Sequence, residues 1–488
     1  MAKRWRAQEL VDLVADPGSQ ECWDEPIDIT GYPPDYRDQV LAAREKSGID
    51  EAVITGRATI EGRPMAYIVG DFRFLGGSIG RDTAVRIEAA IRRATAEQLP
   101  LIASTSSGGT RMQEGTPAFV RMVSISRAII AHKDAGLPYI VYQRHPTTGG
   151  VFASWGSLGH ITVAEPEAML GFLGPRVYEV LNNQPFPEGV QVAENLVDHG
   201  IIDAIARPEE LRPLAATALR VLTPVDLGAP REKGTPEPLP PREGSVWDSI
   251  EITRRADRPG IRELLRYGAT DVLTLSGTGA ENGPGMLLAV ARLDGLPCVI
   301  VGQDRRIQMT GGPLGPAGLR AAQRGIRLAE MLGLPLVTVV DTPGADLSPE
   351  AEEGGLAGEI SRTLAWLART TVPSVSMILG QGTGGGALAM LPADRMIAME
   401  HGWLSPLPPE GASAIVYKDG SHAKELSELQ RVGAQELLED GIIHRIVAEP
   451  ADPAAEPAEF ARRAVEAITE ELREVAAQKD HWKAGLRP

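Results

Sequence analysis

Two short glycine clusters stand where an apolar segment gives way to a segment rich in small residues. They are TTGGV at Thr147–Val151 and TGGGA at Thr383–Ala387. At such a junction a helix begins, and the N–H groups of its first turn have no acceptor within the helix. The helix dipole adds partial positive charge there, and glycine lets a ligand oxygen come close because it lacks a Cβ. Two such N–H groups aimed at one point would form an oxyanion hole.

A second N–H donor for each hole would come from a second loop. The candidates are SSGGT at Ser106–Thr110 and TPGA at Thr342–Ala345, each of which follows an apolar run. The alternative is that these glycines only make tight turns. We favour the oxyanion hole because the same pair of loops occurs in both halves of the chain.

The sequence does not single out a side chain as a general base. His145 and His160 lie near the first glycine cluster, and either could accept a proton. Asp341 precedes the Pro343–Gly344 turn, where an aspartate also commonly caps local backbone. The chain has no GxxxxGK[ST] phosphate loop, no HExxH and no GxSxG, so the chemistry of those motifs is not indicated.

Alternating strands and helices must position these loops. In the first half, short apolar runs at 99–105 and 137–143 predict buried strands, and the helical periodicity of 117–136 predicts a helix between them. The second half repeats the pattern with strands at 335–341 and 372–380 and a helix at 355–371. Repeated strand–helix–strand units predict an α/β fold with crossover helices.

The chain also divides into two similar halves. VDHGIIDAI around Gly200 matches LEDGIIHRI around Gly441, and the cluster at Gly149 matches the one at Gly385, in the same order and at nearly the same separation. Between the halves, 222–245 is dense in proline, glycine and charge, which is typical of a linker. We therefore predict domains at 1–226 and 246–488 joined by a linker at 227–245.

Composition excludes several classes of protein. The chain has 488 residues, 43% of them hydrophobic, and a formal net charge of −16, which argues against a broad nucleic-acid surface. Its two cysteines, Cys22 and Cys298, support neither a disulfide framework nor a four-thiolate zinc site, and we expect no metal. No signal peptide or long apolar run is present, so we expect a cytoplasmic protein without a membrane span.

The first half resembles the β subunit of bacterial acetyl-CoA carboxylase carboxyltransferase, and the second half resembles the α subunit. The resemblance covers about 51–205 and 247–447, so the chain is similar to a fused β–α carboxyltransferase. In the first half it rests on DFRFLGGSIG (71–80), SGGTRMQEG (107–115), TTGGVFAS (147–154), AEPEAMLGFLGPRV (164–177) and LVDHGIIDAI (196–205). In the second half it rests on ARLDGLPCVIVGQDRR (291–306), DTPGA (341–345), GQGTGGGALAM (380–390), SPLPPEGASAIVYKD (405–419) and LLEDGIIHRIV (437–447).

This resemblance implies two tandem crotonase-like domains, each a ββα superhelix. It also implies a homo-oligomer in which an N-terminal half holds an acyl-CoA and a C-terminal half of another subunit holds carboxybiotin. The thioester enolate would be stabilised by the loops of Gly108, Gly109, Gly149 and Gly150. The ureido oxygen of biotin would be stabilised by the loops of Gly344, Ala345, Gly385, Gly386 and Ala387. We further predict that the CoA phosphates are bound by Arg73, Arg81 and Arg111.

The chain departs from these subunits in three respects. The cysteines of a zinc ribbon are missing, and a helical pattern at 5–16 takes the ribbon's place. Gln381 stands where the α subunit has an acidic residue, and no Met-Lys-Met biotin acceptor occurs. Biotin would therefore arrive on a separate carboxyl-carrier protein, loaded by a biotin carboxylase.

Two other functions remain open at this point. A protein of this fold could instead decarboxylate malonyl-CoA or malonyl-acyl-carrier protein without biotin, which needs only the enolate hole and a proton donor. The intact second glycine loop argues against that function, because a biotin-free enzyme has less use for it. The third possibility is an inactive scaffold subunit of a carboxylase assembly, which broken glycine loops would favour; here they are intact.

Overall fold

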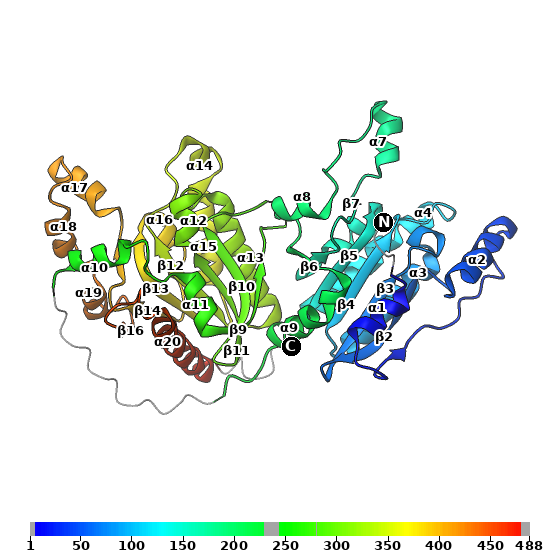
Figure 1. Ribbon diagram of the computed structural model, residues 1–488, viewed down its shortest axis with the longest axis horizontal. Coiled ribbons are helices and arrows are strands. Elements are labelled where there is room, and N and C mark those ends of the chain that lie inside the picture. Colours follow the sequence, from blue (N-terminus) through cyan, green and yellow to red (C-terminus); the bar gives the residue numbers. More distant parts are fainter. Residues whose placement is uncertain (1–4, 229–243, 280, 480–488) are drawn as a thin grey trace. The chain divides into compact units, whose positions relative to one another are not determined.

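The computed structural model describes residues 5–228, 244–279 and 281–479. The chain divides into two compact units, the N-terminal unit Met1–Arg220 and the C-terminal unit Val221–Pro488. Each unit is built around its own twisted sheet, as the ribbon drawing shows (Figure 1).

The sheet of the N-terminal unit has eight strands in the order β1-β2-β3-β4-β5-β6-β8, with β7 paired to β5. The first three strands are antiparallel, and from β3 onward the neighbours are parallel. The strands are β1 Glu21–Cys22, β2 Val53–Ile60, β3 Arg63–Gly70, β4 Leu101–Ser107, β5 Tyr139–Thr148, β6 Ile161–Ala164, β7 Leu170–Gly171 and β8 Ala204–Ile205.

Helices cover both faces of this sheet. Apolar side chains of α3 and α5 pack on one face of β2 to β5, while α1 contacts β2 and β3. The helices are α1 Ala7–Val14, α2 Pro34–Ser47, η1 Leu75–Gly77, α3 Arg81–Ala96, α4 Thr116–Phe119, α5 Arg121–Asp134, α6 Gly149–Phe152, η2 Trp155–Ser157, α7 Pro175–Asn182, α8 Ala193–Asp198, η3 Pro208–Glu210 and α9 Leu211–Leu222.

The C-terminal unit repeats this sheet. Its order is β16-β14-β13-β12-β11-β10-β9, with β15 paired to β13, and again only the first three strands in sequence are antiparallel. The strands are β9 Ala269–Leu275, β10 Met286–Leu293, β11 Leu296–Gln303, β12 Leu336–Thr342, β13 Ser374–Thr383, β14 Arg395–Met399, β15 Trp403–Ser405 and β16 Arg445–Val447.

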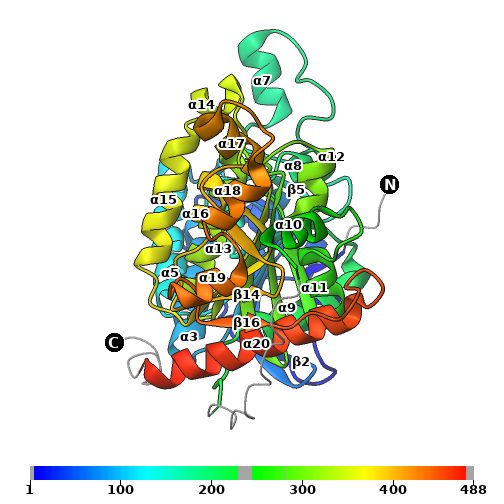
Figure 2. The same cartoon turned by 90° about the vertical axis from the view of Figure 1, so that its left-hand side faces the viewer.

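The helices of the C-terminal unit lie on both faces of the sheet. On one face α11 and the long α20, red in Figure 2, bury an extensive apolar cluster. The helix α13 packs on β10 and β11. The helices are α10 Val246–Arg254, α11 Ile261–Gly268, α12 Arg305–Thr310, α13 Pro316–Leu332, α14 Pro349–Glu353, α15 Leu356–Ala368, α16 Gly384–Leu388, α17 Pro409–Tyr417, α18 Ala423–Leu429, α19 Ala434–Glu439 and α20 Pro457–Gln478.

The internal repeat predicted from sequence is confirmed by these two sheets. Strand pairs such as β4 and β12, or β5 and β13, have the same length and the same neighbours. The predicted α/β fold, the crossover helices and the helix near the N-terminus are also confirmed. The predicted helix at 117–136 is divided into α4 and α5, with Val120 between them.

Sequence analysis did not predict the antiparallel hairpins that begin each sheet. Both turn through two residues with positive φ: Glu61 and Gly62 between β2 and β3, and Asp294 and Gly295 between β10 and β11. That backbone twist suits a two-residue hairpin, and Asp-Gly is one of its usual signals. The Asp294–Gly295 pair therefore carried a hairpin signal in the sequence, whereas Glu61–Gly62 did not.

The two compact units meet after Arg220, and the domain bounds at 226 and 246 stay a prediction. Leu227 already packs in the core of the C-terminal unit, although it had been assigned to the linker. Most of the predicted linker, 229–243, lies outside the described residues.

A buried histidine makes the stability of the N-terminal unit depend on pH. His132 on α5 is fully buried, with Nδ1 3.0 Å from Thr95 Oγ1 and Nε2 3.3 Å from the carbonyl oxygen of Pro138. Burial lowers the pKa of His132 from 6.5 to about 4. The folded state therefore holds the neutral ring at pH values where the unfolded chain takes up a proton.

We expect this histidine to destabilise the fold as the pH falls from about 6.5 to 4, by about 3 kcal/mol at the lower end. Urea unfolding midpoints of the native chain and His132→Gln, measured across that range, check this. The native midpoint should fall more steeply than that of the variant. Parallel pH curves for the two proteins would contradict the assignment.

Candidate active site

The first loop of the N-terminal unit turns out of β4 at Gly108 and Gly109. Gly109 has a φ of +102°, and its N–H donates to Ser107 Oγ over 3.0 Å. Ile79 then pairs with the loop: its N–H donates to the Gly109 carbonyl oxygen, and its own carbonyl oxygen accepts from Arg111 N–H. These two bonds use Gly109 and Arg111, the residues on either side of Thr110. The N–H of Thr110 itself therefore faces away from Ile79.

The second loop of this unit leaves β5 and begins α6. Gly149 has a φ of +63°, and the two loops touch through their backbones, since a Cβ placed on Gly109 would lie 3.5 Å from the amide nitrogen of Gly150. Gly150 lies in the first turn of α6, where amides lack helical acceptors. In the part of the chain that the structure describes, neither Thr110 N–H nor Gly150 N–H has a protein acceptor.

The C-terminal unit builds the same two loops. Gly344 N–H donates to Thr342 Oγ1 over 3.1 Å, and Leu314 pairs with Ala345 as Ile79 pairs with Thr110. A Cβ placed on Gly386 would lie 3.4 Å from the amide nitrogen of Ala345, so these loops are also in contact. Among the described residues, Ala345 N–H and Gly385 N–H likewise have no protein acceptor.

The structure corrects the register of the repeat by one residue. Gly149 and Gly384 both begin a helix, with φ values of +63° and +64°, so Gly149 corresponds to Gly384 and not to Gly385. Gly150 therefore corresponds to Gly385, and Val151 takes the place of Gly386. The run of three glycines in the second cluster made the sequence alignment ambiguous.

Thr110 is a residue that the sequence analysis did not select, although its amide completes the first pair of donors. Ser107 and Thr342 were also missed, and their hydroxyl groups accept from the glycine amide two residues later. A Ser or Thr two residues before glycine at a strand end was the available signal. The selected Ala387 is buried in the first turns of α16.

Arg111 does not have the environment of a phosphate ligand. It is fully buried, and its guanidinium group binds the Glu51 carboxylate, Tyr36 Oη, Thr83 Oγ1 and the Ser78 carbonyl oxygen. Burial alone would lower the pKa of Arg111, but the bonds and charge of Glu51 outweigh it and raise the pKa. A group enclosed in this way has no free face for a solvent-borne phosphate, so the burial of Arg111 argues against the predicted phosphate contact.

The other two arginines have different settings. Arg73 makes two bonds to the Asp71 carboxylate, at 3.0 and 2.7 Å, which occupy much of its guanidinium group. Arg81 begins α3, its side chain is half exposed, and its Nε lies 3.3 Å from Glu114. Arg81 is therefore the one of the three predicted phosphate ligands that has substantial access to solvent.

The candidate bases are engaged in holding the fold. His145 Nδ1 accepts the Met169 N–H over 3.1 Å, and His160 Nδ1 accepts the Tyr139 N–H over 3.0 Å. Asp341 is fully buried, and its Oδ1 accepts the Gln381 N–H. Burial raises the pKa of Asp341, against the charge of Arg305. Each of these three side chains therefore already has a structural hydrogen bond.

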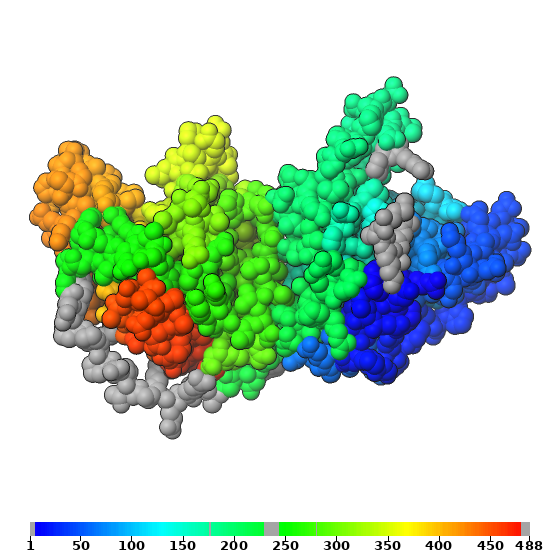
Figure 3. Space-filling model, viewed as in Figure 1, coloured from blue at the N-terminus to red at the C-terminus, as the bar shows by residue number. Residues whose placement is uncertain are grey.

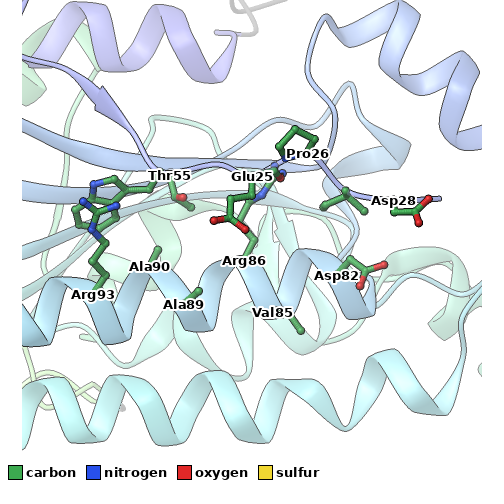
Figure 4. Close-up of a pocket in the computed structure, with 12 residues that line it drawn as sticks. Glu25, Pro26, Asp28, Thr55, Asp82, Val85, Arg86, Ala89, Ala90 and Arg93 are labelled. Atoms are coloured by element: carbon green, nitrogen blue, oxygen red, sulfur yellow. The ribbon is translucent and has the colours of Figure 1, made fainter. Parts of the chain in front are cut away.

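A separate cavity of about 510 Å³ lies between the segment Trp23–Asp28 and α3. Figure 4 shows Arg86 of α3 facing Glu25 across it, with Arg93 farther along the same helix. The Arg93 guanidinium group stacks on the Trp23 ring at 4.5 Å. None of the glycine-loop residues lines this cavity.

Residues 34–484 match the family model described as the carboxyl transferase domain. This chain belongs to the carboxyl transferase family. It is an enzyme of the carboxyltransferase type, as the sequence resemblance predicted.

No group of three or more His, Cys, Asp or Glu side chains able to hold a metal ion occurs in residues 5–228, 244–279 and 281–479. Over the same residues, no helix combines the length and the hydropathy needed to cross a membrane.

Relatives extend the match over almost the whole chain. The probable biotin-dependent acyl-coenzyme A carboxylase beta3 subunit of Mycobacterium tuberculosis is 54% identical over 472 residues, covering 96% of this chain and 94% of the relative. The acetyl-coenzyme A carboxylase carboxyl transferase subunits beta/alpha of Salinispora arenicola are 37% identical over 447 residues, covering 88% and 78%.

A solved structure shares the fold. A crystal structure of transcarboxylase 12S, described as a hexamer with methylmalonyl-coenzyme A bound, matches with a TM-score of 0.77 and 21% identity, covering 97% of this chain and 90% of that chain. The predicted two-domain crotonase-like architecture is thereby confirmed.

The buried Arg111–Glu51 pair leads to a prediction about stability. Arg111→Met would leave a carboxylate buried without its partner, which typically costs about 3–5 kcal/mol. We expect the urea midpoint of the variant to fall accordingly. Arg81→Ala, at a half-exposed site, should stay within about 0.5 kcal/mol of the native chain. An Arg111→Met variant as stable as the native chain would show that the pair does not hold the loop.

Proposed function

We propose that this protein is the carboxyltransferase component of a biotin-dependent acyl-CoA carboxylase and transfers a carboxyl group from carboxybiotin to acetyl-CoA or another short acyl-CoA. The observation that carries the proposal is the pair of matched loops in each unit, each pair presenting two main-chain N–H groups that have no acceptor among the described residues. The relatives' names, which include biotin-dependent acyl-coenzyme A carboxylase and acetyl-coenzyme A carboxylase, agree with it.

The reaction produces negative charge on two different oxygens. Carboxybiotin would supply CO₂ when its C–N bond breaks, which would leave negative charge on the ureido group. That anion would accept the α-proton of the acyl-CoA, placing the charge on the thioester oxygen, and the enolate would then form a carbon–carbon bond to CO₂. Each oxygen needs its own preorganised donors, and main-chain amides at a helix start provide them without titrating.

In this proposal the N-terminal unit serves the thioester. Thr110 and Gly150 amides, with the supporting turns at Gly108, Gly109 and Gly149, would donate to the enolate oxygen. Arg81 is the remaining candidate for a CoA phosphate, because half of its side chain is exposed.

The C-terminal unit would serve the ureido oxygen. The Ala345 and Gly385 amides are the donors, and Gly344 and Gly386 keep the approach free of side chains. These two amides suit the ureido carbonyl oxygen, which is neutral at first and becomes negatively charged in the reaction. N–H groups stabilise such an oxygen by donating hydrogen bonds to it. Biotin would come on a carrier protein, since the chain has no Met-Lys-Met acceptor.

Valine substitutions test the two loop pairs separately. A Cβ on Gly150 would lie 3.3 Å from Thr110 Oγ1, and one on Gly386 would lie 3.4 Å from the amide nitrogen of Ala345. Either valine would crowd one pair of donors, and losing one donor typically costs about 100–1000-fold in turnover.

We expect both variants to lose carboxyl transfer between malonyl-CoA and free biotin. Gly150→Val should also lose any biotin-free decarboxylation of malonyl-CoA, whereas Gly386→Val should keep it. Circular dichroism and melting serve as controls for folding. Full activity of Gly386→Val with biotin would contradict the biotin role, and a native chain that decarboxylates malonyl-CoA but never transfers to biotin would favour the decarboxylase.

We also propose that the chain is a homo-oligomer in which the N-terminal unit of one copy meets the C-terminal unit of another. Exposed apolar residues gather at corresponding helices of the two units, Val180 and Leu181 on α7 and Ile415 and Val416 on α17. Both helices protrude from the surface of their own unit in the space-filling view (Figure 3). Protruding apolar patches of this kind are typical of contact surfaces.

Light scattering is expected to give a mass of at least twice 52.1 kDa for the active protein. Replacing Ile415 and Val416 by Glu should lower that mass and the transfer activity together, because apolar burial drives the association. Replacing the exposed Leu41 on α2 in the same way gives a matched control. A fully active monomer would exclude a site formed between copies.

A further inference from the structure

One buried amide side chain joins the two glycine loops of the C-terminal unit. Gln303, the last residue of β11, is fully buried. Its Oε1 accepts the Asp341 N–H over 3.0 Å, and its Nε2 donates to the Gly386 carbonyl oxygen over 2.7 Å. Asp341 leads directly into the Gly344–Ala345 loop, so this one side chain is bonded to both loops.

The corresponding place in the N-terminal unit carries no such side chain. β3 and β11 have the same length, so Gly70 corresponds to Gln303, and Ser106 corresponds to Asp341 on the matched strands β4 and β12. A Cβ placed on Gly70 would lie 3.2 Å from the amide nitrogen of Ser106, in the direction that Gln303 takes towards Asp341. The two units therefore share a backbone but hold their loops by different contacts.

We infer that Gln303 is a positioning residue for the carboxyl-transfer reaction: it fixes the separation of the Ala345 and Gly385 amides so that both reach one ureido oxygen. The inference rests on the proposed function of the C-terminal loops. Donors in an oxyanion hole work at about 2.7–3.1 Å from the charged oxygen, so a small change of loop separation removes one of them. The bond to Gly386, the residue next to Gly385, sets that separation.

The hydrogen-bond pattern of Gln303 can be switched by pH in a single variant. In Gln303→Glu the protonated carboxyl accepts from Asp341 N–H and donates to the Gly386 oxygen, as the amide does. The ionised carboxylate can only accept, so it repels the Gly386 oxygen. The proton is therefore required for positioning, and activity relative to the native chain is retained at low pH and lost as the pH rises.

The surroundings of this site determine where the introduced carboxyl titrates. Burial raises the pKa of a carboxyl, which in buried sites reaches about 8–9. Charged groups stand on the elements around Gln303. Acidic neighbours raise the pKa of the introduced carboxyl further and basic ones lower it, although each arginine is already paired with an acid. The groups are Asp304 before α12, Arg305 of α12, Asp341 of β12, Arg258 before α11, Arg262 of α11 and Glu449 after β16.

The experiment measures carboxyl transfer from malonyl-CoA to free biotin between pH 6 and pH 9 with the full chain. For Gln303→Met, which is close in size but forms neither bond, we expect kcat to fall about tenfold or more at every pH. Its affinity for malonyl-CoA, which binds the other unit, should not change. For Gln303→Glu the ratio of kcat to that of the native chain should fall steadily as the pH rises.

Gln323→Glu is the matched control. Gln323 is a buried glutamine of the same unit, and its Nε2 donates to Glu359 Oε2 over 2.8 Å and to neither loop. This variant should lose stability as the pH rises while its kcat per folded molecule follows the native chain. That comparison separates positioning from a general effect of burying a carboxyl.

Each outcome decides a different claim. Native kcat in Gln303→Met, or a ratio for Gln303→Glu that is the same at pH 6 and pH 9, would overturn the inference. If Gln303→Glu does not fold, the kcat and binding affinity of Gln303→Met decide alone. A native chain that never transfers a carboxyl group to biotin would instead overturn the proposed function, before any variant is measured.

Discussion

The candidate chemistry of this protein depends on main-chain amides at the ends of parallel strands, which find no acceptor in the part of the chain that the structure describes. In each unit one such amide follows a left-handed glycine after the fourth strand, and the other lies in the first turn of a helix that begins with a left-handed glycine. Ordinary sheet and helix hydrogen bonding cannot reach either position. The antiparallel hairpin, the crossover helices and the buried anchors all serve to keep these two turns in contact.

The anchors differ between the units, although the backbone is repeated. The N-terminal loop is fixed by an ion pair between Arg111 and Glu51, and the C-terminal loops are joined by a neutral amide, Gln303. A buried ion pair is costly to break from one side, whereas a neutral amide can be replaced with less damage to the fold. The same turn geometry is thus supported by two kinds of interaction with different sensitivity to substitution.

Much of the architecture could be predicted from the sequence, because β4, α5, β5 and their counterparts have clear periodicity and end at glycine or proline. The glycine loops were found for the same reason. The enclosure of Arg111 could not be predicted, because its partners Glu51 and Tyr36 are distant in sequence. The role of Thr110 was missed because a main-chain donor has no characteristic side chain, and the register at Gly384 was ambiguous within a run of glycines.

Because the donors are main-chain amides, the side chains at these positions are free to change. Any residue except proline supplies an N–H, so Thr110 in one unit and Ala345 in the other can present the same donor with unrelated side chains. A comparison of protein sequences that looks for invariant side chains would pass over both positions. The backbone shape of the loops must be kept. The residues least free to change are therefore the glycines that allow this shape and the buried side chains that hold it.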